Sequence, residues 1–298
     1  MRHALAILIP ARNESDRVGE TVRTLREAFS IAPPLTGEAG GGAAASMLIT
    51  GFAPPPTGSP RPRGEPNRGS PCLQGEPNGG GLPKVACDEP STGEEKRGAA
   101  IVVLDDGSTD GTAEQALQAG AQVVRVSDYL PRTGSKGDAL WLGWQLVEAP
   151  VYLFLDADLG ASARHAVRLL TPVQLHQADM TIGVLPPAGR TGGFGTVVQL
   201  SRLYLYWRTG RRFRAPLSGQ RAITRKLLMQ LRGFAPGYGL ELGLTLDACL
   251  LNARILEIET PFEHRSYGRT LKGFGHRARQ LRDVIKAMGG IRHGPIIP

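Results

Sequence analysis

Short apolar runs separated by helical patterns constrain the fold of this chain more than any other feature. The runs at Ala4–Ile9, Ala99–Leu104 and Val151–Leu155 are continuous and rich in branched residues. Such runs are typical of strands that are buried on both faces of a parallel sheet. A fourth strand is predicted at Gln122–Val126, and helical periodicity fills the segments between the strands. The alternation therefore predicts an α/β fold with a mostly parallel central sheet and helices on both faces.

The helices are predicted from apolar spacing and from capping residues. Ser15 or Asp16 is expected to cap the first helix, in which apolar residues from Val18 to Phe29 share one face. The remaining elements are helices near 113–119, 137–147, 163–170, 196–208, 225–231 and 240–251, strands near 179–183 and 255–259, and a basic helix near 275–288. Four aromatic residues at helical spacings are expected to pack in the core or a groove: Trp141, Trp144, Tyr204 and Trp207.

A segment of unusual composition interrupts this pattern. Between Pro33 and Gly98 lie 12 of the 23 prolines and 14 of the 39 glycines. Such a segment buries too little apolar surface to offset its chain entropy. Residues 33–98 are therefore predicted to be a disordered Gly/Pro-rich insertion between the first helix and the second strand.

Cysteine content and hydropathy predict a soluble cytoplasmic protein. The three cysteines form no metal-like pair, and no apolar run approaches the length of a membrane span. The net charge of +8 is uneven, because 201–232 contains nine Lys and Arg without an acid, and 264–298 contains eight against one. Such clusters bind phosphate-bearing ligands, an anionic membrane or nucleic acid, or form a solvated face. A peripheral contact of the basic C-terminal helix with the inner membrane face therefore stays open.

Polar motifs follow three of the predicted strands. Pro10-Ala11-Arg12-Asn13-Glu14 follows the first, Asp105-Asp106-Gly107-Ser108 the second, and Asp156-Ala157-Asp158 the strand at Val151. Parallel α/β sheets bind ligands beyond the carboxyl ends of their strands, so these motifs are expected to converge on one crevice.

The Asp156-Ala157-Asp158 motif predicts a metal. Alternate residues at a strand end project two carboxylates in a similar direction, which suits a hard divalent cation such as Mg²⁺ or Mn²⁺. Such a cation would bridge the diphosphate of a bound nucleotide.

These motifs together resemble the family 2 type glycosyltransferases of the GT-A fold, a Rossmann-like fold. The resemblance rests on Ile9–Glu14, Asp105–Asp110, Gly134–Gly137 and Asp156–Asp158, in this order. It implies a single GT-A domain over 1–298, with a nucleotide-binding half at 1–158, an acceptor half at 159–270, and a basic helix and tail at 271–298. It also implies transfer of a sugar from a nucleoside-diphosphate sugar, a UDP- or GDP-sugar, to a hydroxyl or phosphate acceptor.

The resemblance also implies the donor site. Asp158 would be the principal metal ligand, Asp156 would hold the ribose or the donor sugar, and Lys136 would lie beside the base and phosphates. The remaining nucleotide-binding residues would be Pro10, Ala11, Arg12, Glu14, Asp106, Gly107 and Ser108.

The second half resembles glucosyl-3-phosphoglycerate synthases and their relatives. The motifs are Pro216–Gln220, Gly237–Gly243 and Phe262–Arg265. By this resemblance Glu241 would touch the sugar or the acceptor and His264 would ligate the metal. The other residues assigned to the acceptor are Gly219, Tyr238, Gly239 and Arg190. Arg190, with Arg211, Arg212 and Arg214, would either clamp an acceptor phosphate or belong to a solvated face.

Several questions stay open at the level of sequence. An inverting enzyme would use Glu241, or less favourably Asp247, as a base, whereas in a retaining enzyme Glu241 only orients substrate. In both courses Lys136 stabilises the departing diphosphate. The acceptor is either a phosphorylated small molecule or a polyprenyl phosphate at a membrane, and homodimer formation is open. The alternative of another class is a nonenzymatic module that binds nucleotide sugars or nucleic acid.

Overall fold

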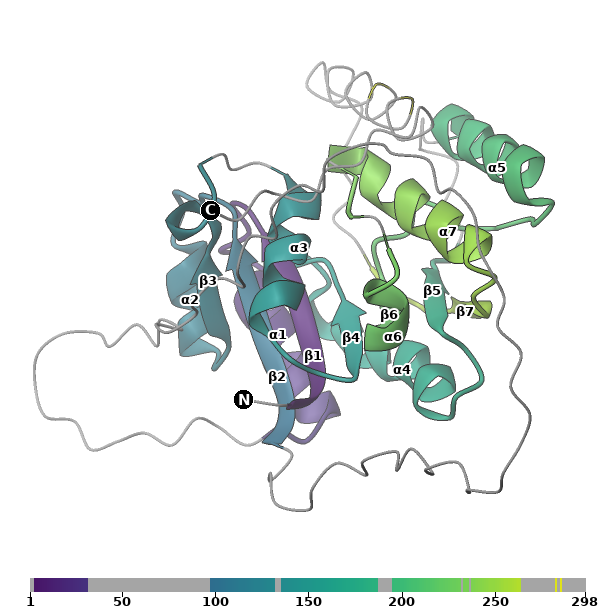
Figure 1. The fold of residues 1–298 in the computed structure, drawn as a ribbon. Helices are drawn as coiled ribbons and strands as arrows, with labels where there is room; N and C mark the ends of the chain where they lie inside the picture. The colour runs from purple at the N-terminus through teal and green to yellow at the C-terminus, as the bar shows by residue number, and fades with distance from the viewer. Residues whose placement is uncertain are drawn as a thin grey trace, which may run out of the picture. The chain divides into compact units, whose positions relative to one another are not determined.

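The fold is organised around one sheet. The computed structural model describes residues 3–31, 97–131, 135–186, 195–231, 233–235 and 237–263, together with Arg282 and Ile285. In this part of the chain seven strands form a sheet in the order β3-β2-β1-β4-β6-β5-β7 (Figure 1). The strands are β1 (His3–Ala11), β2 (Arg97–Asp105), β3 (Gln122–Arg125), β4 (Val151–Phe154), β5 (Met180–Val184), β6 (Arg221–Thr224) and β7 (Ile255–Glu259).

The sheet is mostly parallel, as predicted. β1 pairs in parallel with β2 and β4, β2 with β3, and β5 with β7. β6 runs antiparallel to both of its neighbours, β4 and β5. β6 was not predicted, because its four residues, Arg-Ala-Ile-Thr, form no apolar run and include a charged residue.

Helices cover both faces of the sheet. Along β1 the side chains of Ala6 and Leu8 enter the core on one face, and those of Ile7 and Ile9 enter the core on the other. The first face is covered by α3 (Lys136–Leu146), α5 (Gly195–Thr209), α6 (Arg225–Leu228) and α7 (Leu240–Leu250). The second face is covered by α1 (Val18–Ala28), α2 (Thr112–Gln118), the 3-10 helix η2 (Gly160–Ala166) and α4 (Val167–Gln174). Two further 3-10 turns are η1 (Val126–Asp128) and η3 (Gly237–Gly239).

Close packing sets the position of α3. A Cβ on Gly143 would lie 2.8 Å from a methyl carbon of Leu104 in β2 and 3.2 Å from one of Leu8 in β1. Glycine at this position lets the helix lie directly on the two strands, so the first turn of α3 reaches the edge where both strands end.

Some local predictions were wrong. Neither Ser15 nor Asp16 caps α1; the N-cap is Arg17, and no side chain accepts a hydrogen bond there. The helix predicted at 163–170 begins as η2 and becomes α-helical at Val167, and the helix predicted at 225–231 ends at Leu228. Trp207 is not packed in a core or groove but is 76% exposed. The insertion and the basic C-terminal helix lie outside the described residues, apart from part of β2, Arg282 and Ile285.

Membrane-spanning helices are absent from the part of the chain that the structure describes, because none of its helices is both long and apolar enough.

Candidate functional site

The ends of β2, β1 and β4 lie side by side, which brings the three polar motifs to one edge of the sheet. Ala11 pairs with Asp105, and Leu8 pairs with Phe154, two residues before Asp156. The motif after β1 and the motif after β2 are then joined directly. The backbone N–H of Asn13 donates to Ser108 Oγ at 3.0 Å, and the N–H of Thr109 donates to Asn13 Oδ1 at 2.9 Å.

Further bonds make these two loops one rigid unit. The N–H of Glu14 donates to Thr112 Oγ1 at 2.9 Å, and the N–H of Ser15 donates to Asp110 Oδ2 at 3.2 Å. Burial raises the pKa of Asp110, but hydrogen bonds from Thr112 and Ser15 outweigh it and lower the pKa below its usual value. Asp110 is therefore an ionised carboxylate that organises the loops.

A small pocket opens beside this unit. Its volume is about 240 Å³, and its lining includes Gly107 and Ser108, two of the predicted nucleotide-binding residues, together with Arg125. Gly107 has φ +78°, a left-handed conformation that favours glycine, and the neighbouring Ser108 donates its N–H to Asp105 Oδ1 at 3.0 Å.

A charged cluster lies where β4, α3 and α7 meet. Lys136 Nζ lies 2.6 Å from Asp156 Oδ1 and 3.0 Å from Glu241 Oε1. Lys136 is the first residue of α3, Asp156 follows β4, and Glu241 lies in the first turn of α7. Burial lowers the pKa of Lys136, but the two carboxylates outweigh it and raise the pKa above its usual value. Lys136 is therefore a fixed cation at neutral pH.

Gln220 holds the second carboxylate oxygen of Asp156. Its Nε2 donates to Asp156 Oδ2 at 2.7 Å, and its Oε1 accepts the N–H of Asp156 at 3.1 Å. Gly219 leaves room for the cluster, because a Cβ there would lie 2.5 Å from Lys136 Nζ and 3.0 Å from Asp156 Oδ2. Both oxygens of Asp156 are thus engaged, and its carboxylate has one orientation.

Arg221 is linked to Glu241 through Thr245. Its side chain is wholly buried, and it donates to Thr245 Oγ1 at 2.9 Å, to the carbonyl of Pro216 at 2.9 Å and to the carbonyl of Ser218 at 2.8 Å. Thr245 in turn donates to the carbonyl of Glu241 at 2.8 Å. Burial lowers the pKa of Arg221 to about 10, although the charge of Glu241 opposes this shift.

Gln220 and Arg221 were not among the predicted site residues. Gln220 belongs to the Pro216–Gln220 motif, which is the one signal that could have found it. Arg221 carries a weaker signal, a charged residue directly before two apolar ones. Its hydrogen bond to Thr245 joins residues 24 positions apart in the chain and depends on β6, a strand that has no local sequence signal.

The remaining predicted residues fall into two groups. Pro10, Ala11, Arg12 and Glu14 lie at the end of β1 and just beyond it, Asp158 lies in the turn after β4, and Gly239 is the N-cap of α7. Arg190, His264 and the side chain of Tyr238 lie outside the described residues. Within the described ranges no three His, Cys, Asp or Glu side chains form a metal-binding group.

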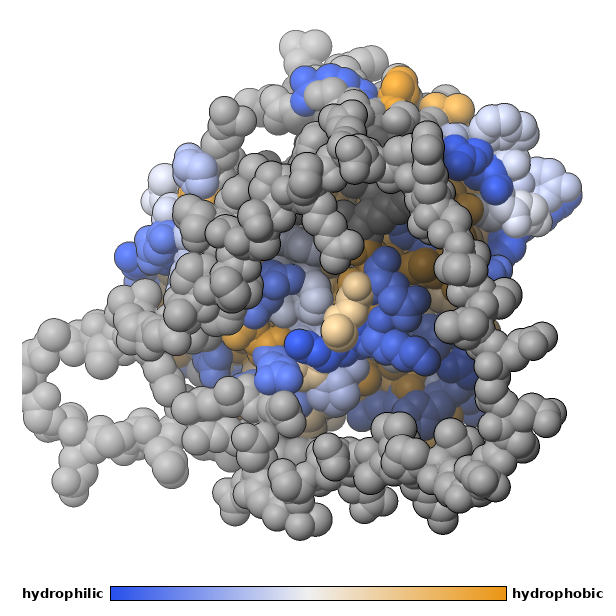
Figure 2. Space-filling model, viewed as in Figure 1, coloured by the Kyte–Doolittle hydropathy of each residue, from blue (hydrophilic) through white to orange (hydrophobic). Residues whose placement is uncertain are grey.

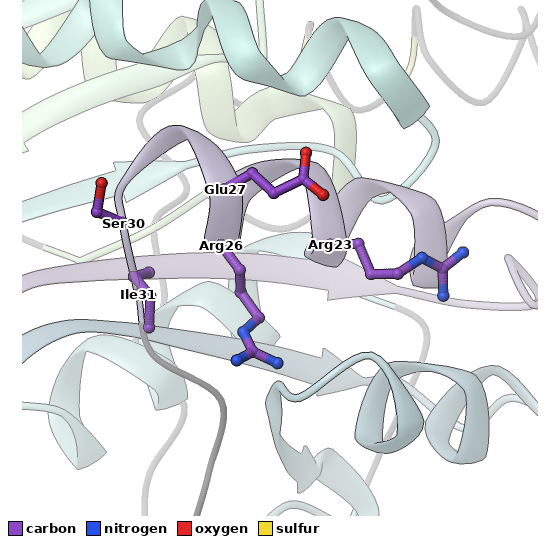
Figure 3. A pocket seen from close by; sticks show the side chains of 5 residues that line it. All are labelled: Arg23, Arg26, Glu27, Ser30 and Ile31. Carbon is purple, nitrogen blue, oxygen red and sulfur yellow. The ribbon is translucent and has the colours of Figure 1, made fainter.

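The larger of the two pockets described lies away from the charged cluster and the joined loops. A depression of about 410 Å³ lies at the last turns of α1 and is lined by Arg23, Arg26, Glu27, Ser30 and Ile31. Figure 3 shows that these side chains spread in different directions instead of converging. Arg26 has a structural contact, since it donates to the carbonyl of Ala119 at 3.1 Å. This depression is not part of the candidate site.

A family model matches part of the chain. Residues 95–231 match glycosyl transferase family 2, a range that includes Lys136, Asp156, Asp158 and Gln220. The resemblance to family 2 glycosyltransferases is confirmed.

Among curated relatives, the glucosyl-3-phosphoglycerate synthase of Mycolicibacterium paratuberculosis is 33% identical over 217 residues, 64% of this chain and 63% of the relative. That of Mycobacterium tuberculosis is 33% identical over 169 residues, 49% of this chain and 50% of the relative. The chain thus spans between half and two thirds of the length of these relatives.

Solved structures of glucosyl-3-phosphoglycerate synthase share the fold. The Mycobacterium tuberculosis enzyme in complex with phosphoglyceric acid has a TM-score of 0.64 at 22% identity, over 96% of this chain and 80% of that chain. The same enzyme with Mn²⁺, uridine-diphosphate-glucose and phosphoglyceric acid has a TM-score of 0.59 at 24% identity, with the same coverage. The predicted GT-A type of α/β fold is thereby confirmed.

Proposed function

We propose that this chain is a metal-dependent glycosyltransferase that moves glucose from UDP-glucose to a small phosphorylated acceptor of the glyceric acid type. The observation that carries the proposal is the cluster in which Lys136 bridges Asp156 and Glu241, beside the ends of β1 and β2. The relatives support the substrates, since their names and complexes specify glucosyl-3-phosphoglycerate, uridine-diphosphate-glucose and phosphoglyceric acid. None of these names supports a polyprenyl phosphate acceptor.

The nucleoside is assigned to the joined loops after β1 and β2. Their cross-strand hydrogen bonds fix backbone groups around Asn13 and Ser108, and the adjacent pocket reaches Gly107. A rigid loop pair loses little conformational entropy when a ligand binds. Pro10 to Glu14 and Asp106 to Ser108 would therefore hold the base and ribose without rearrangement.

The metal is assigned to Asp158. The two oxygens of Asp156 are already held by Lys136 and Gln220, so Asp156 orients substrate and Asp158 is the carboxylate assigned to the cation. One or two carboxylates with substrate phosphates are a usual ligand set for Mg²⁺, and the residues present fit this set. His264 would complete the set as the resemblance implies. A bound Mn²⁺ or Mg²⁺ would neutralise charge on the departing nucleoside diphosphate.

The stereochemical course assigned to the enzyme is retention. A base for an inverting reaction must accept the proton of the acceptor hydroxyl. Glu241 Oε1 already accepts a hydrogen bond from Lys136 Nζ at 3.0 Å, so this oxygen is engaged by the lysine and is not directed at an acceptor hydroxyl. Glu241 therefore orients the sugar and the acceptor, while Lys136 stabilises the leaving diphosphate.

The test is donor turnover by the full-length protein. UDP-glucose and a panel of other nucleotide sugars are supplied with phosphoglyceric acid, with Mn²⁺ or with EDTA, and nucleoside diphosphate release is measured. We expect release from UDP-glucose that depends on metal and on acceptor, and that falls about 10²-fold or more in Lys136→Ala and Asp158→Asn. The matched control is Lys226→Ala, which removes an exposed lysine on α6.

Two results would contradict the proposal. Turnover that continues in EDTA would show that the reaction does not require a metal ion. Full activity of Lys136→Ala would show that the cluster around Lys136 takes no part in the reaction.

A further inference from the structure

We propose that the exposed face of α5 docks on an anionic membrane surface. This face, called here the outer face of α5, consists of Leu200, Leu203, Tyr206 and Trp207, which are 37%, 65%, 46% and 76% exposed. The other side of the helix is buried through Val197, Ser201 and Leu205, and α5 packs against α7. Figure 1 shows α5 beside α7 at the margin of the described residues.

Spacing makes the outer face continuous. Leu200, Leu203 and Trp207 follow one another at intervals of three and four residues, so they lie on one side of the helix, with Tyr206 beside them. Four exposed large apolar or aromatic side chains on 15 residues form a patch, whereas single exposed apolar residues are ordinary on protein surfaces.

Arginines are interleaved with this patch. From Gly195 to Arg214 there are five arginines and no acidic residue. The Arg208 guanidinium lies 6.0 Å from the ring centre of Trp207, and that of Arg212 lies 4.9 Å from the ring centre of Tyr206. In the space-filling view the surface over α5 accordingly combines blue and pale residues (Figure 2).

The positive charge is only partly compensated within the described residues. Arg214 pairs with Glu259 at 2.8 Å, and Arg211 donates to the carbonyl of Ala253 at 3.1 Å. Arg208 and Arg212 are exposed beside the aromatic rings. These two guanidinium groups are therefore placed to bind lipid phosphates at the headgroup level of a membrane, beside the rings of Trp207 and Tyr206.

This combination fits a lipid interface better than other occupants. Trp and Tyr prefer the headgroup level, leucines enter the acyl boundary, and arginines attract anionic lipids. A second copy bound through the same face would bring the arginines of both copies together, which is repulsive. Leu200 and Leu203 would gain nothing from a nucleic acid backbone, whose recognition depends on phosphate contacts and base stacking.

The proposal concerns a different element from the basic C-terminal helix, for which the sequence left membrane contact open. It does not depend on the proposed enzymatic function, because no residue of the outer face belongs to the cluster around Lys136.

The test uses Trp207 as a probe in the full-length protein. Trp141 and Trp144 pack against each other with ring centres 5.6 Å apart, and Trp141 also packs on Phe234, so Trp207 is the exposed tryptophan. We expect a blue shift of tryptophan emission on vesicles of phosphatidylcholine with 30% phosphatidylserine, and loss of the shift at high salt. Pure phosphatidylcholine vesicles are expected to give no shift.

Variants separate the apolar and the charged contributions. In vesicle co-sedimentation, Leu203→Ser with Trp207→Ser is expected to weaken binding about tenfold or more. Arg208→Gln and Arg212→Gln are each expected to weaken it about fivefold. The matched controls are Met229→Ser, also 65% exposed but placed after α6, and Arg164→Gln with Arg168→Gln on η2 and α4, which are expected to bind as the parent.

The outcomes are decisive in both directions. Salt-sensitive binding to anionic vesicles that the α5 variants weaken and the controls do not would support the proposal. No binding, equal binding to neutral vesicles, or equal loss in the control variants would overturn it. A parent dimer that becomes monomeric in Leu203→Ser with Trp207→Ser would assign the face to a second copy instead.

Discussion

Replacing Gly219 by alanine tests whether the position of Lys136 matters for the reaction. The new Cβ would lie 2.5 Å from Lys136 Nζ and 3.0 and 3.1 Å from the two oxygens of Asp156. An ordinary contact at these atoms is about 3.5 Å, so the ammonium group must retreat by about 1 Å. Asp156 has less freedom to move, because Gln220 holds both its Oδ2 and its N–H.

The expected effect is on activity and not on folding. The end of a lysine side chain moves at little cost, so we expect the free energy of unfolding in urea to change by less than about 1 kcal/mol. A shift of about 1 Å in a positioning group costs about 10²-fold in rate, equivalent to about 2.7 kcal/mol in the activation free energy. The assay is release of nucleoside diphosphate from UDP-glucose at saturating acceptor.

A control and a double variant make the result interpretable. Gly98→Ala adds a Cβ that meets nothing within 4 Å, and its activity is expected to equal that of the parent. In a Lys136→Ala background the Gly219→Ala change should add little, because the closest contact is gone. Parental activity of Gly219→Ala would refute the reasoning, and so would an additive loss in the double variant.

Three further expectations concern the groups around this cluster. Arg221→Met leaves Thr245 Oγ1 and two carbonyls without their donor, and we expect it to lower the free energy of unfolding by about 3 kcal/mol in urea titrations. Arg254→Gln, which removes a solvent-exposed guanidinium from its ion pair with Asp179, is expected to have a much smaller effect in the same titrations. Gln220→Leu removes the bond to Asp156 Oδ2, and we expect kcat to fall more than KM rises, with partial recovery in Gln220→Asn; an unchanged kcat would contradict a positioning role. The pKa of Lys136 is raised on folding, so its ion pairs stabilise the protein fully below its unfolded pKa of 10.5 and lose that effect as the pH rises through the folded value. The difference in unfolding free energy between the parent and Lys136→Met should therefore stay constant from about pH 6 to about pH 9, and a rise within that range would show that folding lowers the pKa instead.

The sequence by itself determined the layered framework. The runs that became β1, β2 and β4 are continuous and apolar because both faces of the sheet are covered, and this burial is visible in any local window of the sequence. The polar motifs after these strands share one edge because parallel strands end on the same side. The position of Asp156 at that edge followed from these local patterns, whereas that of Lys136 was implied only by the resemblance to family 2 glycosyltransferases.

Only the tertiary structure decided which side chains hold the cluster together. β6 is four residues long and pairs antiparallel with β4 and β5. Because it forms only through these two neighbours, no local sequence pattern predicts it. Gln220 reaches Asp156 across 64 residues of chain, and Arg221 reaches Thr245 across 24. Hydrogen bonds between distant residues depend on the register of a strand, which neither composition nor periodicity specifies.

The exposure of Trp207 was decided in the same way. Helical spacing places Trp207 and Tyr204 on a helix but does not say which side of that helix meets the core. Packing of Leu205 and Ser201 toward the protein turned Trp207 outward. The physical reason is that periodicity is a property of one helix, whereas burial is a property of the helix together with its neighbours.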